Sequence, residues 1–275
     1  MAAGDAVAVT AYAGSMNTPL AQDLTILTGA SRGMGLAMAR QLLRPGHLLL
    51  CLSRQVNPEL EQQAHAAGVH LEQWSQDLAD AGEAAERLQR WLHSLHAPAI
   101  ASATLINNAG MLPSIVPLQD CPADELVRAL RVGLEAPMLL SGAFLRATQA
   151  WVDAGWQGER KLLNISSGLG RRAMASQSPY CAAKAGLDNF SRCVALEQAR
   201  QPHGAKVVSL APGVIATGMQ LQMRAADSRH FPDRERFVGL HQQGLLASPE
   251  QAATRVLAWL ERPDFGDPVI ADVRD

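Results

Sequence analysis

The sequence predicts an α/β fold in which a doubly wound parallel sheet is covered by helices on both faces. Short apolar runs alternate along the chain with longer stretches of helical spacing, which is typical of such a sheet. No internal repeat or low-complexity linker divides the chain, so its 275 residues are expected to form one large domain. Hydrophobic residues make up 48% of the sequence but aromatic ones only 4%, so the core must consist mainly of Ala, Leu, Val and Met.

Seven short apolar runs predict buried strands. They lie at residues 24–28, 47–52, 69–74, 102–106, 161–165, 205–210 and 268–273. Strands that are buried on both faces read as continuous apolar runs, because a parallel sheet carries helices on each side. The runs therefore favour a parallel arrangement.

The stretches between these runs predict the helices that connect parallel strands. Helical spacing is found at residues 34–44, 80–96, 123–150, 179–199 and 249–261. The segment 218–248 fits the alternation poorly and is rich in Met, Arg, His and Gln. Because ligands bind beyond the carboxyl ends of the strands, a long insertion there predicts a substrate lid.

The first residues are expected to be a tail. Residues 1–22 have small side chains, no clear periodicity and the helix-discouraging Asn17-Thr18-Pro19, and Met16 is a candidate natural start. Whether residues 1–15 belong to the natural protein stays open. Residues 23–275 are then the single catalytic domain.

Composition argues against several classes of partner. A net charge of −2 with no run of Lys and Arg disfavours nucleic acid. No apolar run approaches about 18 residues, and the first basic residue is Arg32, so neither a membrane span nor a secretory signal is expected. The four cysteines show no metal spacing and are expected to be reduced, and His93 and His96 have no apparent third ligand. We therefore expect a soluble, cytoplasmic protein without a metal.

The first strand runs directly into a glycine-rich turn, Thr28-Gly29-Ala30-Ser31-Arg32-Gly33-Met34-Gly35, and a helix follows. Glycines let the backbone approach a pyrophosphate, and the start of the helix supplies amide donors. Such turns also occur without ligands, so this feature alone leaves both interpretations open.

The region of the second strand indicates which nucleotide is bound. NAD enzymes commonly place an acid about 20 residues after the glycines, but no Asp or Glu occurs between Asp23 and Glu59. Arg32 and Arg54 could instead bind a 2′-phosphate through charge-assisted hydrogen bonds, although both could be solvated surface residues. NADP(H) is therefore the predicted cofactor.

Tyr180 and Lys184 are four residues apart on a predicted helix and so share one face. Lowering the pKa of a phenol by three units needs about 4 kcal/mol, which one cation at about 4 Å supplies at an effective dielectric near 20. Ser167 lies 13 residues before Tyr180, at the end of a predicted strand. The three residues together predict acid–base chemistry at a carbonyl, with Ser167 and Tyr180 also contacting the substrate.

Five motifs in this order resemble the short-chain dehydrogenase/reductase family over about residues 23–273. The family's pattern is matched by the glycine-rich turn, Asp77-Leu78, Asn107-Asn108-Ala109-Gly110, the Ser167, Tyr180 and Lys184 set, and Pro212-Gly213-Val214-Ile215-Ala216-Thr217. The resemblance implies a Rossmann-type fold and a dimer or tetramer. It also implies that these residues hold the cofactor: Gly29, Ser31, Arg32, Gly33, Met34, Gly35, Arg54, Asp77, Leu78, Asn107, Ala109, Gly110, Tyr180, Lys184, Pro212, Gly213, Ile215 and Thr217.

Within that family the chain looks most like sepiapterin and benzil reductases. The stretch 135–140 and the stretch 213–220, together with the ending Asp272-Val273-Arg274-Asp275, support this similarity. The resemblance implies that Asp272 anchors the substrate, although an ordinary charged strand end explains it equally well. A vicinal or aromatic dicarbonyl is preferred over a pterin as substrate.

One position departs from the family pattern. Gly133 stands where many relatives carry an Asn. The family resemblance implies that this Asn bulges the helix and supports a proton relay. Glycine tolerates unusual backbone geometry, so the relay is in doubt but not excluded.

The predicted function is NADPH-dependent reduction of a small-molecule carbonyl to an alcohol, with Tyr180 as proton donor. The alternatives are an NAD-dependent alcohol dehydrogenase and a non-catalytic nucleotide sensor on the same fold. The substrate itself is not readable, because its pocket is expected to come from the 111–117 loop and the 218–248 lid.

Overall fold

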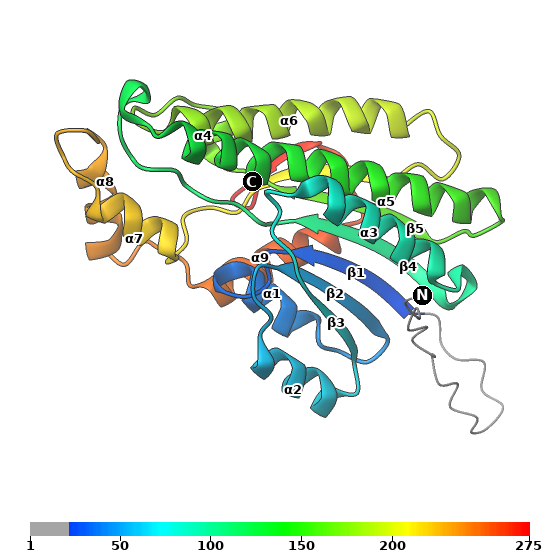
Figure 1. Ribbon diagram of the computed structural model, residues 1–275. Coiled ribbons are helices and arrows are strands. Elements are labelled where there is room, and N and C mark those ends of the chain that lie inside the picture. The colour runs from blue at the N-terminus through cyan, green and yellow to red at the C-terminus, as the bar shows by residue number, and fades with distance from the viewer. Residues whose placement is uncertain (1–21) are drawn as a thin grey trace, which may run out of the picture.

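The computed structural model describes residues 22–275 (Figure 1). Met16 and the rest of the predicted tail therefore lie outside the described residues, except Gln22, which begins β1. Seven strands form one sheet in which all neighbours are parallel, in the order β3-β2-β1-β4-β5-β6-β7. The strands are β1 (Gln22–Thr28), β2 (His47–Ser53), β3 (His70–Ser75), β4 (Ile100–Asn107), β5 (Glu159–Ile165), β6 (Lys206–Ala211) and β7 (Ile270–Asp272). The predicted doubly wound fold is confirmed.

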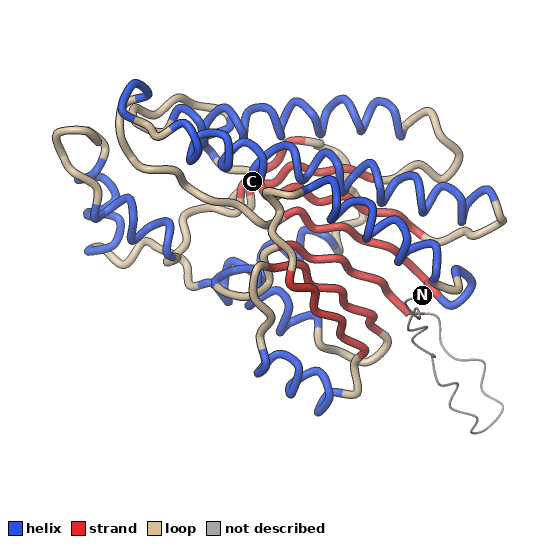
Figure 2. The backbone as a smooth tube through the Cα atoms, in the orientation of Figure 1, coloured by secondary structure: helices blue, strands red, loops and turns tan. Residues whose placement is uncertain are grey.

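Helices cover both faces of this sheet (Figure 2). The helices α1 (Gly33–Leu42), α2 (Pro58–Ala67) and α9 (Pro249–Leu260) pack on one face, and α3 (Ala81–Ser94), α4 (Ala123–Leu130), α5 (Ala136–Asp153) and α6 (Ser178–Gln198) lie on the other. Strand β2 shows how one sequence serves two cores. Leu48, Leu50 and Leu52 enter the core beneath α3 and α5, whereas Leu49 and Cys51 enter the core beneath α1 and α9.

The order of the strands places a crevice at the carboxyl ends of β1 and β4. Strand β1 pairs with β2 on one side and with β4 on the other, so the chain changes direction across the sheet at this point. In open α/β sheets ligands bind at such a switch point. The loops that follow β1 and β4 carry the glycine-rich turn and the Asn107-to-Gly110 segment.

Three elements differ from the sequence prediction. Strand β7 is shorter than the predicted 268–273; Pro268 has no N–H to give to a neighbouring strand. Helix α2 was not predicted, although Asn57 caps it by accepting a hydrogen bond from the Leu60 N–H at 3.0 Å, and Pro58 opens it. The predicted helix 123–150 is not continuous.

A π-helical turn at Arg131–Glu135 separates α4 from α5. Here the Ala136 N–H donates to the Arg131 carbonyl oxygen, five residues earlier instead of four. Gly133 is the central residue of this turn and is buried. A Cβ atom on Gly133 would lie 3.1 Å from the Cβ of Ala183 on α6, so the absence of a side chain lets the two helices approach closely.

The segment predicted as a lid forms two short helices, α7 (Gly218–Ala225) and α8 (Arg234–Gln242), which project to one side of the main layers (Figure 1). They rest on a small hydrophobic cluster of Leu169, Met174, Phe231 and Phe237, in which the two phenyl rings stack with centroids 5.6 Å apart. A hydrogen bond from the Ser176 hydroxyl to the His230 carbonyl oxygen joins the loop before α6 to the connection between α7 and α8.

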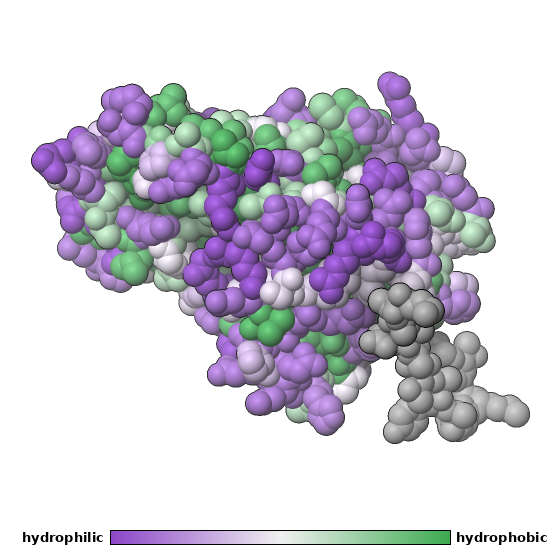
Figure 3. Space-filling model, in the orientation of Figure 1, coloured by the Kyte–Doolittle hydropathy of each residue, from purple (hydrophilic) through white to green (hydrophobic). Residues whose placement is uncertain are grey.

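The face of the molecule in Figure 3 is mainly hydrophilic, and its hydrophobic residues form small separate groups. Among residues 22–275, no helix is long and apolar enough to span a membrane.

Candidate active site

A cavity of about 1040 Å³ opens at the carboxyl ends of the strands. The loops after β1, β2, β4, β5 and β6 form its floor, and α7 and α8 cover one end. The cavity brings together residues from all five predicted motifs and from the lid. Of the predicted site residues, these line it: Gly29, Ser31, Arg32, Gly33, Met34, Gly35, Arg54, Asp77, Leu78, Ala109, Gly110, Ser167, Tyr180, Lys184, Pro212, Gly213, Ile215, Thr217 and Asp272.

The glycine-rich turn is packed so tightly that it admits no side chain at two positions. Gly29 has φ +73°, and a Cβ there would lie 2.9 Å from the Cα of Ala109. A Cβ on Gly35 would lie 2.1 Å from the Gly29 carbonyl oxygen. These contacts hold the first turn of α1 against the end of β1, leaving its backbone open to the cavity.

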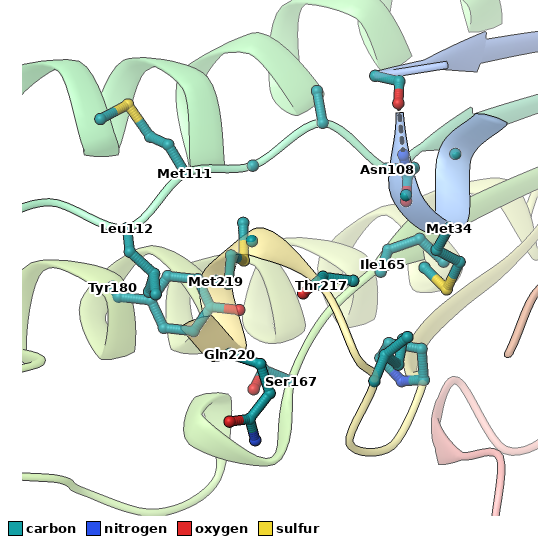
Figure 4. Close-up of a pocket in the computed structure, with 18 of the residues that line it drawn as sticks. Met34, Asn108, Met111, Leu112, Ile165, Ser167, Tyr180, Thr217, Met219 and Gln220 are labelled. Atoms are coloured by element: carbon teal, nitrogen blue, oxygen red, sulfur yellow. Dashed lines mark hydrogen bonds between the residues drawn. The ribbon is translucent and has the colours of Figure 1, made fainter. Parts of the chain in front are cut away.

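Asn108 ties this turn to the end of β4 (Figure 4). Its side-chain Nδ2 donates to the Thr28 carbonyl oxygen at 2.9 Å, and the Thr28 hydroxyl accepts the backbone N–H groups of Asn108 and Ala109 at 2.9 and 3.0 Å. Asn108 also lines the cavity, although the sequence analysis singled out its neighbour.

Asn107, predicted to bind the cofactor, does not line the cavity. As the last residue of β4 it points into the core, and its Nδ2 donates to the Ser141 hydroxyl at 3.1 Å and to the Asn164 side-chain oxygen at 2.9 Å. Side chains alternate along a strand, so two adjacent asparagines cannot both face the crevice. Asn107 therefore supports the floor from below.

The cofactor end of the cavity is rich in cationic groups. Arg32 occupies the N-cap position of α1 without a side-chain capping hydrogen bond, and Arg54 follows β2. Neither forms an ion pair with any residue in the range 22–275. The hydroxyl of Ser53 beside them is buried and has no hydrogen-bond partner within the same range. Two free guanidinium groups, an unpartnered hydroxyl and a glycine cradle fit the phosphates of a dinucleotide that carries a 2′-phosphate.

Asp77 lines the same end but already has partners. Its carboxylate forms an ion pair with Arg128 at 2.5 Å and accepts the Ala79 N–H at 3.0 Å. The carboxylate charge is thereby largely balanced, so Asp77 does not oppose an anionic ligand.

Ser167, Tyr180 and Lys184, which the sequence predicts to be catalytic, line the same cavity, and Figure 4 shows Ser167 and Tyr180 there. Ser167 follows β5, and its hydroxyl accepts the Leu169 N–H at 3.1 Å. Tyr180 lies in the first turn of α6, which Pro179 helps to start. Lys184, one turn further, donates from Nζ to the Ile165 carbonyl oxygen at 2.7 Å, and Nζ lies 5.8 Å from the centre of the Tyr180 ring.

The protonation of Tyr180 and Lys184 differs from the sequence prediction. Burial raises the pKa of Tyr180 above its usual range, and the hydrogen bond with Ser167 only partly opposes this. Burial likewise lowers the pKa of Lys184 from 10.5 to about 8. The prediction that Lys184 lowers the phenol pKa is wrong for this structure, because Lys184 Nζ is hydrogen-bonded to a backbone carbonyl and burial dominates at the ring.

Buried polar contacts hold α6 against the sheet behind these residues. Asn164 Nδ2 donates to the Ser191 hydroxyl at 2.9 Å, and the Ser209 hydroxyl donates to Asp188 at 2.6 Å. Arg171 pairs with the same Asp188 at 3.2 Å. The network joins α6 to β5, to β6 and to the segment after β5, so it holds α6 in place against the sheet.

The substrate end of the cavity is formed largely by the lid. Met219, Gln220 and Met223 from α7 and Phe237 and Leu240 from α8 line it. The lid was predicted from the sequence, but these residues were not. Gln220 lies at the end of the 213–220 stretch that carried the family resemblance, and its burial could not be read from that stretch.

Asp272, the predicted substrate anchor, lines the cavity and is only 7% exposed. Arg274 binds its carboxylate with two hydrogen bonds, Nε to Oδ1 at 2.7 Å and Nη2 to Oδ2 at 2.5 Å. These hydrogen bonds lower the pKa of Asp272. The carboxylate therefore has a partner within its own strand end.

Within residues 22–275, no three His, Cys, Asp or Glu side chains gather in a way that could hold a metal ion. The candidate site is one cavity, which has Arg32 and Arg54 at one end, Ser167, Tyr180 and Lys184 in its wall, and α7 and α8 at the other end.

Comparison with known proteins agrees with this geometry. The chain is 32% identical to a benzil reductase ((S)-benzoin forming) of Bacillus cereus and 35% identical to that of Bacillus subtilis, each match covering 87% of this chain and 94% of the relative. It is 29% identical to the sepiapterin reductase of Rattus norvegicus over 91% of this chain and 95% of that protein.

Solved structures share the fold. The crystal structure of a 3-oxoacyl-[acyl-carrier protein] reductase from Brucella melitensis in complex with NAD matches with a TM-score of 0.74 at 23% identity, over 92% of this chain and 95% of that chain. The profile of the short chain dehydrogenase family matches residues 23–228. The chain therefore belongs to the short-chain dehydrogenase/reductase family, whose members are oxidoreductases that act on CH–OH and C=O groups.

Proposed function

We propose that this protein is an NADPH-dependent reductase that converts a carbonyl to an alcohol, with Tyr180 as the proton donor. The observation that carries the proposal is the meeting of Ser167, Tyr180 and Lys184 in the same cavity as the glycine-rich turn. A nucleotide sensor would not need these three side chains beside its ligand.

The cofactor would be held by the residues of the cationic end. The backbone of the glycine-rich turn and the first turn of α1 would bind the pyrophosphate, and Arg32 and Arg54 would bind the 2′-phosphate. When bound, NADPH supplies the hydride for the carbonyl carbon. Asn108 and Asp77, through their own hydrogen bonds, would keep this end of the cavity in shape.

The protein's own residues would handle the proton. The Tyr180 hydroxyl would donate its proton to the oxygen of the substrate as negative charge develops there, and the Ser167 hydroxyl would donate a hydrogen bond to the same oxygen. Burial raises the pKa of Tyr180, which keeps the phenol protonated at neutral pH and ready for reduction. Lys184, on the same helix face, would help to hold the cofactor, as the family resemblance implies.

The substrate class that fits best is a vicinal or aromatic dicarbonyl. The lid end of the cavity is lined by two methionines, Leu240 and the aromatic ring of Phe237, together with the polar side chains Gln220, Gln222 and Arg236. Methionine side chains adapt to flat, apolar molecules of varied shape. The two benzil reductases among the relatives support the same class.

Cofactor choice tests the first half of the proposal. We expect NADPH to bind at least about tenfold more tightly than NADH in fluorescence titrations, which corresponds to about 1.4 kcal/mol. Arg54→Ala should lose most of this preference, because it removes one cation that faces the 2′-phosphate. Arg90→Ala on the exposed face of α3 is the matched control and should keep it. Equal affinities in the wild type, or an unchanged preference in Arg54→Ala, would contradict the proposal.

Turnover tests the second half. NADPH oxidation should be measured against diketones, pterins, quinones and simple ketones, with NADH in parallel. A protein that binds NADPH but oxidises it with no carbonyl in this panel would favour the nucleotide sensor.

A further inference from the structure

The lining of the cavity carries more cationic side chains than carboxylates. Its cationic residues are Arg32, Arg54, Arg128, Arg172, Lys184, Arg236 and Arg274. Among the described residues its carboxylates are those of Asp77 and Asp272 alone. Arg128 binds the first of them and Arg274 binds the second. The cavity therefore offers an anion several cations that no carboxylate in its lining balances.

Two of these cations, Arg172 and Arg236, have no role in the site described so far. Arg32 and Arg54 would bind the cofactor, and Lys184 donates to a backbone carbonyl oxygen. Within the part of the chain that the structure describes, the guanidinium groups of Arg172 and Arg236 form neither an ion pair nor a hydrogen bond. Their donors are free for a ligand.

Arg172 lies beside the predicted catalytic serine. A Cβ placed on Gly168, the residue after Ser167, would have Arg172 Nη2 at 3.8 Å and Arg172 Nε at 3.9 Å. The preceding arginine takes the carboxylate that is nearby, since Arg171 pairs with Asp188 at 3.2 Å. The guanidinium group of Arg172 is thus placed near the carbonyl that Ser167 would bind, and no carboxylate of its own segment neutralises it.

Arg236 reaches the same cavity from the lid helix α8. The next residue, Phe237, packs in one hydrophobic cluster with Leu169 and Met174, which stand on either side of Arg172 in the sequence. The two segments that carry the free guanidinium groups are therefore packed against each other at the lid end of the cavity.

The other charged groups of the lid are not available to a ligand in the cavity. Arg229 and Arg234 pair with Asp227 and Glu235. None of these four residues lines the cavity, and no other charged residue of the described segment 218–248 lines it except Arg236. The lid thus presents one cation to the cavity, and it is the one without a carboxylate partner.

We propose that Arg172 and Arg236 bind a carboxylate of the substrate that lies next to the carbonyl to be reduced, so that the substrate class is a 2-oxo acid with an apolar remainder. This inference rests on the proposed function and narrows it. A guanidinium group presents its N–H donors in a fork that matches the two oxygens of a carboxylate. NADPH gives the hydride to the keto carbon and Tyr180 gives the proton to its oxygen, so the product is a 2-hydroxy acid.

The test compares two substrates that differ in charge. Benzoylformate has a carboxylate next to its ketone, and in methyl benzoylformate an uncharged ester takes the place of the carboxylate. The kcat/KM of each is measured at saturating NADPH for the wild type, Arg172→Gln, Arg236→Gln and the double variant. Arg255→Gln, at an exposed position of α9 outside the cavity lining, is the matched control.

We expect each single variant to lower kcat/KM for benzoylformate by about tenfold, and the double variant to lower it further, because charge-assisted hydrogen bonds are lost. The kcat/KM for the ester should change by less than about threefold. Arg236→Lys keeps the charge, so it should retain more of the activity on benzoylformate than Arg236→Gln. The Kd for NADPH and the Tm should stay close to wild type, and Arg255→Gln should leave both substrates unchanged.

Ionic strength gives a second measurement. Both arginines are exposed to water, so salt screens their attraction for an anion. Raising the NaCl concentration from about 0.05 M to about 0.5 M should lower the wild-type kcat/KM for benzoylformate more than that for the ester. The double variant should lose this difference between the two substrates.

Several results would overturn the inference. A ratio of the two kcat/KM values that stays constant in all three variants would show that neither arginine recognises the carboxylate, and equal losses for both substrates would make the arginines structural. Weaker NADPH binding with an unchanged ratio would assign them to the cofactor. A wild type that reduces the ester or another ketone but not benzoylformate would also contradict the inference, while leaving the proposed function intact. A wild type that binds NADPH and reduces no carbonyl would remove the proposed function, and the inference with it.

Discussion

The floor and the lid of the cavity are built in different ways. In the floor, buried hydrogen bonds between side chains join β4 to β5, as between Asn107 and Asn164, and β6 to α6, as between Ser209 and Asp188. The lid rests on the apolar cluster of Leu169, Met174, Phe231 and Phe237, and its methionines are among the side chains that it presents to the cavity. Directional bonds fix positions, whereas methionine-rich contacts allow side chains to repack. We infer that the floor fixes the reaction and the lid selects the substrate.

The largest effect should come from the floor. Tyr180→Phe keeps the ring but removes the proton donor, so turnover should fall by about a hundredfold or more. The Kd for NADPH should change little, because the ring still fills its place on α6. Single-turnover kinetics and fluorescence titration measure the two quantities. If this variant reduced a good substrate at a near-normal rate, Tyr180 would not be the proton donor. The inference that the floor fixes the reaction while the lid selects the substrate would then be wrong.

The floor also carries a buried charge whose cost can be measured. The pKa of Lys184 falls from 10.5 to about 8 on folding because the ammonium is buried. The unfolded chain therefore binds more protons between pH 8 and 10.5, and the free energy of unfolding should decrease as the pH falls through this range. The full penalty, about 3 kcal/mol at most, is present below pH 8.

Lys184→Met should remove this pH dependence. We expect the variant's free energy of unfolding minus that of the wild type to be larger, meaning a relatively more stable variant, at pH 7 than at pH 10.5, as measured by urea denaturation. Lys206→Met, at an exposed strand start, controls for the loss of a surface lysine. A wild type and a Lys184→Met variant whose stability difference is constant with pH would show that the ammonium is not desolvated.

Much of the floor was predictable from sequence, whereas the lid was not. Strand–helix alternation and the spacing of Ser167, Tyr180 and Lys184 depend on local periodicity, which a sequence displays directly. Whether Asn107 or Asn108 faces the cavity depends on the residue at which β4 ends. The partner of Asp272 and the burial of Gln220 depend on contacts between distant segments, and no local pattern encodes them. The pKa of Tyr180 was misjudged for the same reason, because burial is a property of the fold.

The π-helical turn tests how rigid the floor is. Gly133→Ala would place a Cβ 3.1 Å from the Cβ of Ala183, between Tyr180 and Lys184 on α6. Such a contact requires a shift of a few tenths of an ångström in a tightly packed helix, so turnover should fall severalfold, by less than about tenfold. Gly133→Asn should also stay within about tenfold if the turn tolerates its side chain.

A second substitution identifies the cause. Ala183→Gly in the Gly133→Ala background removes the opposing Cβ and should restore turnover, apart from the intrinsic cost of a helical glycine, about 1 kcal/mol of stability. Gly82→Ala on α3, where a new Cβ has nothing within 4 Å, is the control and should leave turnover unchanged. Unaltered turnover in Gly133→Ala would show that α6 can yield, and that the floor is less rigid than its hydrogen bonds suggest.

The smallest effect is expected at Asp272, where the sheet meets the lid end of the cavity. Arg274 already binds both carboxylate oxygens, so the group that a pterin would need as an acceptor is engaged. Asp272→Asn should therefore change kcat/KM for a vicinal dicarbonyl by less than about threefold, since a diketone has no N–H or O–H to donate. Arg274→Ala frees the carboxylate. If Asp272 can anchor a substrate, this variant should raise kcat/KM for a pterin more than kcat/KM for a diketone. A large, pterin-selective loss of kcat/KM in Asp272→Asn would contradict this view. It would mean that the substrate displaces Arg274 from the carboxylate. A residue of the sheet would then select the substrate together with the lid.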